Sequence, residues 1–131
     1  MKGLRISLIV VAMVLLVASL SACGTNEDSA SGLHVNVNFE EAKALIDGGI
    51  ALLDVRTPEE YAAGHIKEAK LLPLQELEAR LDELDKNTPY LLICRSGNRS
   101  GQAQEILKEA GFAKTYNTLG GMNEWPYEIV Q

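Results

Sequence analysis

A cysteine followed closely by two arginines is the part of this 131-residue chain best suited to chemistry. Cys94 stands at the end of an apolar run, and Arg95 and Arg99 belong to the turn that comes next. Positive charge and free backbone N–H groups stabilise a thiolate, so Cys94 is expected to ionise more readily than a free thiol. The thiolate is the nucleophilic form of cysteine, and an arginine can hold an anionic substrate beside it. The spacing therefore predicts nucleophilic chemistry on a small anion.

The sequence around Cys94 predicts a strand, a tight loop and a helix. Residues 90–93 form a short apolar run, which is typical of a buried strand. A buried structural cysteine at its end is the alternative interpretation. The small and polar residues of the same turn favour a reactive thiol instead: Ser96, Gly97 and Asn98. Beyond them, apolar residues recur at the helical period and a glycine closes the helix: Ala103, Ile106, Leu107, Ala110 and Gly111.

Short apolar segments alternate with amphipathic ones along the rest of the chain. The apolar segments lie near 34–37, 50–55, 70–74, 90–93 and 114–117. Helices are expected after Asn38, after Thr57, which begins a capping box with proline next to it, and over 77–84. This alternation predicts an α/β fold with a mainly parallel open sheet and helices on both faces. Ligands of such sheets bind beyond the carboxyl ends of the strands, where Cys94 is expected.

The first part of the chain has the features of an export signal. Two basic residues precede an almost wholly apolar stretch at 6–20, and Leu20-Ser21-Ala22-Cys23 follows. This tetrapeptide resembles the lipobox of bacterial lipoproteins, which implies removal of residues 1–22 and acylation of Cys23, for example with palmitate. The alternative is a plain transmembrane anchor, for which the apolar stretch is short.

Residues 23–32 and 33–131 are expected to play different parts. The segment after Cys23 is rich in Gly, Ser, Asn and acidic residues and lacks large apolar ones, which predicts a flexible tether. Residues 33–131 are long enough for one hydrophobic core and therefore for a single domain. The lipid would hold that domain on the outer side of the cytoplasmic membrane, or in the periplasm if an outer membrane is present.

Composition argues against several other classes of function. The chain has 12 basic and 18 acidic residues, and loss of the two basic residues of the leader would leave 10 against 18, a net charge of −8. Such an acidic balance argues against a nucleic-acid partner. With Cys23 acylated, Cys94 has no cysteine left to pair with, so no disulfide is expected. His34 and His65 lack the spacing of metal ligands, so no metal is expected.

Three short motifs follow one another along the chain. The first comprises Asp54-Val55-Arg56, Glu60-Tyr61 and Gly64-His65-Ile66, the second is Cys94-Arg95-Ser96-Gly97-Asn98-Arg99-Ser100, and the third is Gly120-Gly121 with Trp125. With these motifs in this order, the chain from about residue 35 to residue 128 resembles the rhodanese-like sulfurtransferase family. It departs from that family at Lys67 and Glu68, where proline and glycine are usual, and around 70–72, where an asparagine is common.

The resemblance implies an α/β domain that transfers sulfane sulfur by a ping-pong mechanism without a cofactor. In that mechanism Cys94 takes sulfur from thiosulfate or a similar donor and passes it, as a persulfide, to cyanide or a thiol. The loop would bind the donor and the persulfide through Arg95, Ser96, Gly97, Asn98, Arg99 and Ser100.

Other motif residues are expected to have structural roles. Asp54 and Arg56 would support the site, with an ion pair from Arg56 to Glu60 across one helical turn as the simpler interpretation. His65 is expected to make structural hydrogen bonds, and Trp125 is expected to pack in the core.

Two alternative functions stay open at this point. One is a cysteine phosphatase or an arsenate reductase. These enzymes have five residues between their cysteine and arginine, whereas four separate Cys94 from Arg99. The shorter loop encloses a smaller anion site, which suits a sulfane sulfur better than a tetrahedral oxyanion. The other alternative is a membrane-tethered persulfide carrier, or a redox module, that acts with a protein partner. The expected partners are a small anionic sulfur donor, a thiol or cyanide acceptor, the membrane through the N-terminal lipid and, for a carrier, a protein acceptor.

Overall fold

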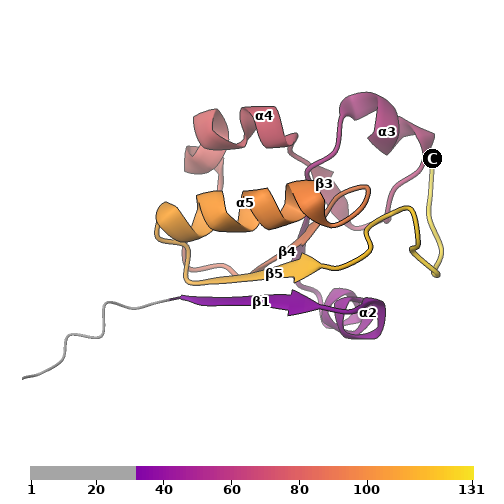
Figure 1. The fold of residues 1–131 in the computed structure, drawn as a ribbon, viewed down its shortest axis with the longest axis horizontal. Helices are drawn as coiled ribbons and strands as arrows, with labels where there is room; N and C mark the ends of the chain where they lie inside the picture. Colours follow the sequence, from indigo (N-terminus) through magenta and orange to yellow (C-terminus); the bar gives the residue numbers. More distant parts are fainter. Residues whose placement is uncertain (1–31) are drawn as a thin grey trace, which may run out of the picture.

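A parallel five-stranded sheet forms the centre of the fold in the computed structural model, which describes residues 32–131. The strands are β1 Leu33–Val37, β2 Ala51–Asp54, β3 Ala69–Leu71, β4 Tyr90–Ile93 and β5 Lys114–Thr118. Their order across the sheet is β1-β5-β4-β2-β3, and Figure 1 shows β1, β5 and β4 running in the same direction. The predicted α/β fold with a parallel sheet is confirmed, and β4 takes a central position with β2 and β5 on its two sides.

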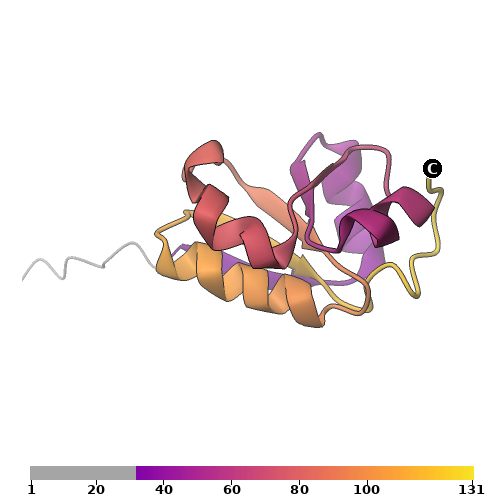
Figure 2. The ribbon, with the colours of Figure 1, turned by 90° about the horizontal axis from the view of Figure 1, so that it is seen from above.

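Helices cover both faces of the sheet, as expected. They are α2 Phe39–Asp47, α3 Pro58–Ala63, α4 Leu74–Leu77 with the 3-10 helix η1 Glu78–Glu83, and α5 Asn98–Glu109. The helices α4 and α5 lie on one face and α2 lies on the other (Figure 1). The view from above shows α4 beside α5 (Figure 2).

Two helix starts have capping boxes, one at Asn38, where the sequence predicts an N-cap, and one at Thr57, where it predicts the box itself. Asn38 accepts a hydrogen bond from the backbone N–H of Glu41, whose carboxylate accepts one from the N–H of Asn38 in return. Thr57 and Glu60 make the same reciprocal pair at the start of α3. These side chains satisfy N–H groups that a helix leaves free in its first turn.

The predicted helix over 77–84 differs from the observed structure. A single turn of α-helix, α4, passes into η1, and Arg80 has a non-helical backbone with φ −121°. The segment begins after Pro73 and has no side-chain cap, so it lacks the start that stabilises α2 and α3. Leu77 and Leu84 are nevertheless buried on the expected face.

The strand β4 is buried on both sides, and its alternation decides where Cys94 points. Tyr90 and Leu92 pack in the apolar cluster beneath α4 and α5, whereas Leu91 and Ile93 pack in the cluster beneath α2. Because successive side chains of a strand point to opposite faces, Cys94 follows Tyr90 and Leu92 toward α5. The thiol is thereby placed beneath the first turn of α5.

Candidate active site

Cys94 lies directly beyond the carboxyl end of β4, in the loop that leads into α5. Its side chain is fully buried. The Sγ atom accepts a hydrogen bond from the backbone N–H of Gly97 at 3.1 Å and from the hydroxyl of Ser100 at 3.3 Å. Gly97 is the N-cap of α5 and makes no side-chain cap, so the first N–H groups of the helix are available to the sulfur. The loop is therefore a cradle for an anion on Cys94.

This cradle favours the thiolate form of Cys94. Burial raises the pKa of the thiol, but hydrogen bonds from the Ser100 hydroxyl and from the backbone of Ser100, Ser96 and Gly97 outweigh it. The pKa of Cys94 is consequently lowered from its ordinary value. The donors that stabilise the charge belong to the loop itself, so a separate general base is not needed to activate the nucleophile.

Glycines allow the loop to fold this tightly. Gly97 has a φ of +92°, a left-handed conformation that a side chain disfavours. A Cβ on Gly121 would lie 2.5 to 2.6 Å from backbone atoms of Arg95 and Cys94. The adjacent N–H groups of Met122 and Asn123 donate to the carbonyls of Cys94 and Arg95 at 2.8 and 2.9 Å. The Gly120-Gly121 motif therefore brings the chain after β5 against the back of the Cys94 loop.

The two arginines of the loop have different surroundings. Arg99 is held by Glu60 of α3 in a bidentate ion pair with N–O distances of 2.7 and 2.8 Å. Arg95 is exposed, and its Nε donates to the Asn123 side chain at 3.3 Å. Within residues 32–131, no carboxylate lies within ion-pair distance of Arg95. Arg95 is therefore the loop guanidinium free to meet an anionic ligand.

The remaining loop residues contribute mostly through the backbone or turn outward. Ser96 is exposed, and its backbone lowers the pKa of Cys94 through a hydrogen bond. Asn98 is exposed, and its side-chain oxygen accepts a hydrogen bond from Gln102 at 2.7 Å, within α5. Ser100 is fully buried against the sulfur. Of the predicted contact residues, Gly97 donates to the sulfur through its backbone at 3.1 Å and Ser100 through its hydroxyl at 3.3 Å.

The predicted ion pair between Arg56 and Glu60 is wrong. Arg56 instead binds Asp54 through Nε at 2.9 Å and Nη2 at 2.7 Å, and its Nη2 also donates to the Gly64 carbonyl at 2.8 Å. Asp54 ends β2, which places its carboxylate within reach of the arginine two residues on. Both members of this pair are buried, whereas Glu60 turns toward α5 to meet Arg99.

His65 and Trp125 have the structural surroundings expected of them. The His65 ring is stacked on that of Tyr61 at 3.7 Å between centroids, and its Nδ1 lies 2.9 Å from the Tyr61 carbonyl. Trp125 is partly buried against the cluster beneath α2 and meets the ring of Phe39 edge-on at 5.6 Å. Neither residue contacts the thiol.

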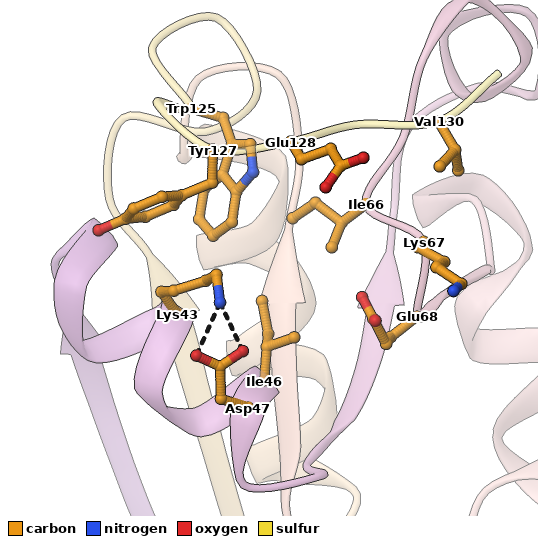
Figure 3. Close-up of a pocket in the computed structure, with 10 residues that line it drawn as sticks. All are labelled: Lys43, Ile46, Asp47, Ile66, Lys67, Glu68, Trp125, Tyr127, Glu128 and Val130. Carbon is orange, nitrogen blue, oxygen red and sulfur yellow. Dashed lines mark hydrogen bonds and ion pairs between the residues drawn. The ribbon is translucent and has the colours of Figure 1, made fainter.

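A cavity of about 210 Å³ lies away from Cys94, between α2, the segment after Gly64 and the C-terminal segment. Figure 3 shows Trp125 and Tyr127 on one side of it and the ion-paired Lys43 and Asp47 on another. Its lining consists of Lys43, Ile46, Asp47, Ile66, Lys67, Glu68, Trp125, Tyr127, Glu128 and Val130. No residue of the loop 94–100 borders this cavity, so the cavity and the loop are separate features.

Other predictions concern residues outside those the structure describes. The leader, residues 1–22, lies wholly outside residues 32–131, as do Cys23 and the tether up to residue 31. In the described part of the chain, no helix is long and apolar enough to cross a membrane. The same residues contain no group of three or more His, Cys, Asp or Glu side chains placed to hold a metal ion.

Comparison with known sequences places the Cys94 loop and its scaffold in one family. The sequence profile described as "Rhodanese-like domain" matches residues 38–128, which include all three motifs. The chain belongs to the rhodanese-like domain family. The predicted family is thus confirmed for the part of the chain that carries Cys94.

Relatives of this rhodanese-like domain include carriers and enzymes by name. The "Putative sulfur carrier protein YrkF" of Bacillus subtilis is 36% identical over 101 residues, which cover 77% of this chain and 55% of YrkF. "Thiosulfate sulfurtransferase GlpE" of Pseudomonas syringae is 33% identical over 96 residues, which cover 70% of this chain and 91% of GlpE. The chain therefore spans about half the length of YrkF and nearly all of GlpE.

Solved structures agree with this assignment. The crystal structure of a rhodanese-like domain protein from Staphylococcus aureus superposes with a TM-score of 0.65 at 34% identity, over 71% of this chain and 92% of that one. The human single-domain sulfurtransferase TSTD1 gives a TM-score of 0.65 at 28% identity, over 69% of this chain and 93% of that one. These comparisons support sulfur transfer as the activity of the family.

Proposed function

We propose that this rhodanese-like domain transfers sulfane sulfur from thiosulfate or a similar small donor to cyanide or a thiol through a persulfide on Cys94. The observation that carries the proposal is the position of Sγ, which is buried and accepts hydrogen bonds from Gly97 and Ser100. A nucleophile with a lowered pKa suits attack on sulfur, and the name of GlpE, a thiosulfate sulfurtransferase, supports the donor class.

The first half-reaction makes one sulfur–sulfur bond and breaks another. The Cys94 thiolate attacks the outer sulfur of thiosulfate, the bond between the two donor sulfurs breaks, and sulfite leaves with the electron pair. The persulfide anion extends from the cradle that held the thiolate, where loop N–H groups stabilise its charge. Arg95 is free to bind the sulfonate end of the donor.

In the second half-reaction, a cyanide or thiolate acceptor attacks the outer sulfur of the persulfide. The products are thiocyanate or a new persulfide and the original Cys94 thiolate. No net oxidation occurs over the cycle, so no cofactor is required.

The test is thiosulfate:cyanide sulfurtransferase activity of the protein and of its Cys94→Ala variant, with intact mass recorded after donor alone. Turnover that is lost in the variant, together with a mass gain of one sulfur atom on the parent, would support the proposal. Ser96→Ala serves as a control, because Ser96 contributes a backbone rather than a side-chain donor. Turnover by Cys94→Ala equal to that of the parent protein would refute the proposed persulfide mechanism.

A persulfide carrier is the second candidate function. The favouring observations are the complete burial of Cys94 and the resemblance to YrkF, which is named as a putative sulfur carrier. A carrier would form one persulfide per chain and release it only to a protein acceptor. A donor screen separates the two, because an enzyme turns over small donors and acceptors with saturable kinetics.

We also propose that the mature protein is a lipoprotein held at the membrane through Cys23, with its domain on the extracytoplasmic face. The support is the sequence Leu20-Ser21-Ala22-Cys23 after a short apolar stretch. Cys23→Ala should abolish membrane association and leave the Cys94 activity intact. Membrane retention of a correctly cleaved Cys23→Ala protein would contradict lipid anchoring.

A further inference from the structure

The carboxylate of Glu60 is fixed in place by two sets of contacts. It binds both terminal nitrogens of Arg99, and one of its oxygens also accepts the backbone N–H of Thr57 at 3.0 Å as part of the capping box. Hydrogen bonds from Arg99 lower the pKa of Glu60 to about 2. The carboxylate is therefore charged at any physiological pH and cannot turn away from Arg99 without breaking the start of α3.

Arg99 stands in the first turn of α5, directly before Ser100, which donates to the reactive sulfur, and it also binds Glu60. The hydrogen bonds that Arg99 donates to Glu60 raise the pKa of the Arg99 guanidinium, and the charges of Glu60, Cys94 and Asp54 raise it further. The negative charge of Asp54 is balanced by its ion pair with Arg56. The charged groups of the loop and its ion pair are thus the thiolate, Arg95, Arg99 and Glu60.

The formal charges of these four groups sum to zero. The thiolate and Glu60 carry one negative charge each, and the two loop arginines carry one positive charge each. Without Glu60 the same site would carry a net positive charge. One carboxylate therefore decides whether the field at the sulfur attracts a doubly charged anion strongly or weakly.

We propose that Glu60 is a specificity-determining residue that cancels the charge of Arg99, so that the site favours sulfur donors with a single negative charge, such as thiol persulfides and thiosulfonates, over the thiosulfate dianion. This inference rests on the proposed sulfur transfer through Cys94. Glu60 acts through Arg99 and does not touch the sulfur, so its role is positioning and charge compensation.

Singly charged donors react by the same balanced step. The Cys94 thiolate attacks the outer sulfur of a thiol persulfide, the donor sulfur–sulfur bond breaks, and a thiolate leaves. With methanethiosulfonate the leaving group is methanesulfinate. This compound differs from thiosulfate in having a methyl group in place of one charged oxygen, so the two form a matched pair of donors that differ by one charge.

The test measures the electrostatic potential at the Cys94 sulfur and does not require the protein to turn over a sulfur donor. Iodoacetate and iodoacetamide have nearly the same shape, but iodoacetate is an anion, and the ratio of their alkylation rates at Cys94 reports local charge. The ratio is read on the Cys94 peptide by mass spectrometry, using the full chain. Any change in the pKa of Cys94 affects both reagents equally and cancels from the ratio.

Glu60→Gln is the informative variant, and Glu59→Gln is its matched control. Glutamine also serves at this position of a capping box, so α3 keeps its start while the charge is lost. Glu59 is exposed in the same helical turn and makes no ion pair with Arg99. Glu60→Gln should raise the iodoacetate to iodoacetamide ratio about threefold, and Glu59→Gln should leave it unchanged. An unchanged ratio in Glu60→Gln, or an equal rise in both variants, overturns the proposal.

The double variant Glu60→Gln with Arg99→Met provides a second test that does not depend on one substitution. It removes both members of the pair, so the ratio should return to the parent value. A ratio that stays as high as in Glu60→Gln contradicts compensation between the two residues.

Donor kinetics then separate the inference from the proposed function. Glu60→Gln should raise kcat/KM for thiosulfate about threefold more than for methanethiosulfonate, mainly through KM. If the parent protein turns over neither donor but the alkylation ratio still changes as expected, the charge compensation holds and the proposed enzymatic activity fails. If both donors turn over and Glu60→Gln changes them equally, sulfur transfer holds and charge selection fails.

Discussion

Two arginine–carboxylate pairs include a residue of the segment after β2, Arg56 in one and Glu60 in the other, and they differ in burial and in surroundings. The side chains of Asp54 and Arg56 are 0% and 7% exposed, lie two residues apart in sequence and fasten the strand end to the Gly64 carbonyl. The side chains of Glu60 and Arg99 are 26% and 27% exposed, lie 39 residues apart and join α3 to the first turn of α5, which follows the Cys94 loop. The same chemistry thus serves a structural purpose in one pair and sets the charge of the site in the other.

The largest effect is expected from breaking the buried pair. Arg56→Met leaves the Asp54 carboxylate buried without its partner, so the free energy of unfolding should fall by about 3 kcal/mol. Urea denaturation followed by circular dichroism measures this loss. A decrease as small as that caused by Arg99→Met would show that the two pairs do not differ in the way proposed.

Breaking the second pair should instead affect reactivity. Arg99→Met removes a positive charge and leaves Glu60 beside the thiolate, so the reaction of Cys94 with thiosulfate should slow about tenfold. The rate of persulfide formation is measured by quenching the reaction at successive times and recording the intact mass of the protein. If the folded variant reacts as fast as the parent, Arg99 does not influence the sulfur.

A third prediction separates the loop donors from the arginines. Ser100→Ala removes a hydrogen bond to the sulfur, so the pKa of Cys94 should rise and the pH profile of its iodoacetamide reaction should move to higher pH. The rate at pH 7 should fall about threefold. An unchanged pH profile would assign the lowered pKa to other groups.

The smallest effect concerns stability in acid. The pKa of Glu60 is lowered from 4.5 to about 2 in the folded protein, so its contribution is present above pH 4.5 and is lost as the pH falls toward 2. Because the pair is partly exposed to water, Glu60→Gln should cost only about 0.5 kcal/mol at neutral pH. Denaturation at several pH values should show the parent and Glu60→Gln converging near pH 2. A constant difference would exclude this linkage.

The pattern of apolar segments was enough to predict the fold and the position of Cys94. Strand alternation, two capping boxes and a cysteine after a buried strand are local features that a sequence displays directly. The transition from α4 to η1 was missed because the leucine spacing is helical, while the absence of a side-chain cap after Pro73 weakens the helix.

The partner of Glu60 could not be read from local spacing. Arg56 is four residues away, which favours an ion pair across one helical turn, but the nearer and fully buried Asp54 captures that arginine. Arg99 is distant from Glu60 in sequence, but the two residues meet in the fold. The strands β2 and β4 are neighbours, α3 follows the carboxyl end of β2, and α5 follows the carboxyl end of β4. The parallel order of the strands could have indicated this ion pair, because the loops that follow adjacent parallel strands lie at the same edge of the sheet.

The parallel sheet also separates the two ends that matter for attachment. Leu33 begins β1 at the amino-terminal edge of the sheet, where its N–H donates to the Ala113 carbonyl, whereas Cys94 follows the carboxyl end of β4 at the opposite edge. In the proposed lipid-anchored form, the tether would join the domain at one end and the sulfur would lie at the other. A bulky tag joined before Leu33 should therefore leave Cys94 approachable by a large acceptor. A tag joined after Gln131, which contacts the carbonyl of Ala63 in α3, would stand on the side of the domain that an acceptor must approach.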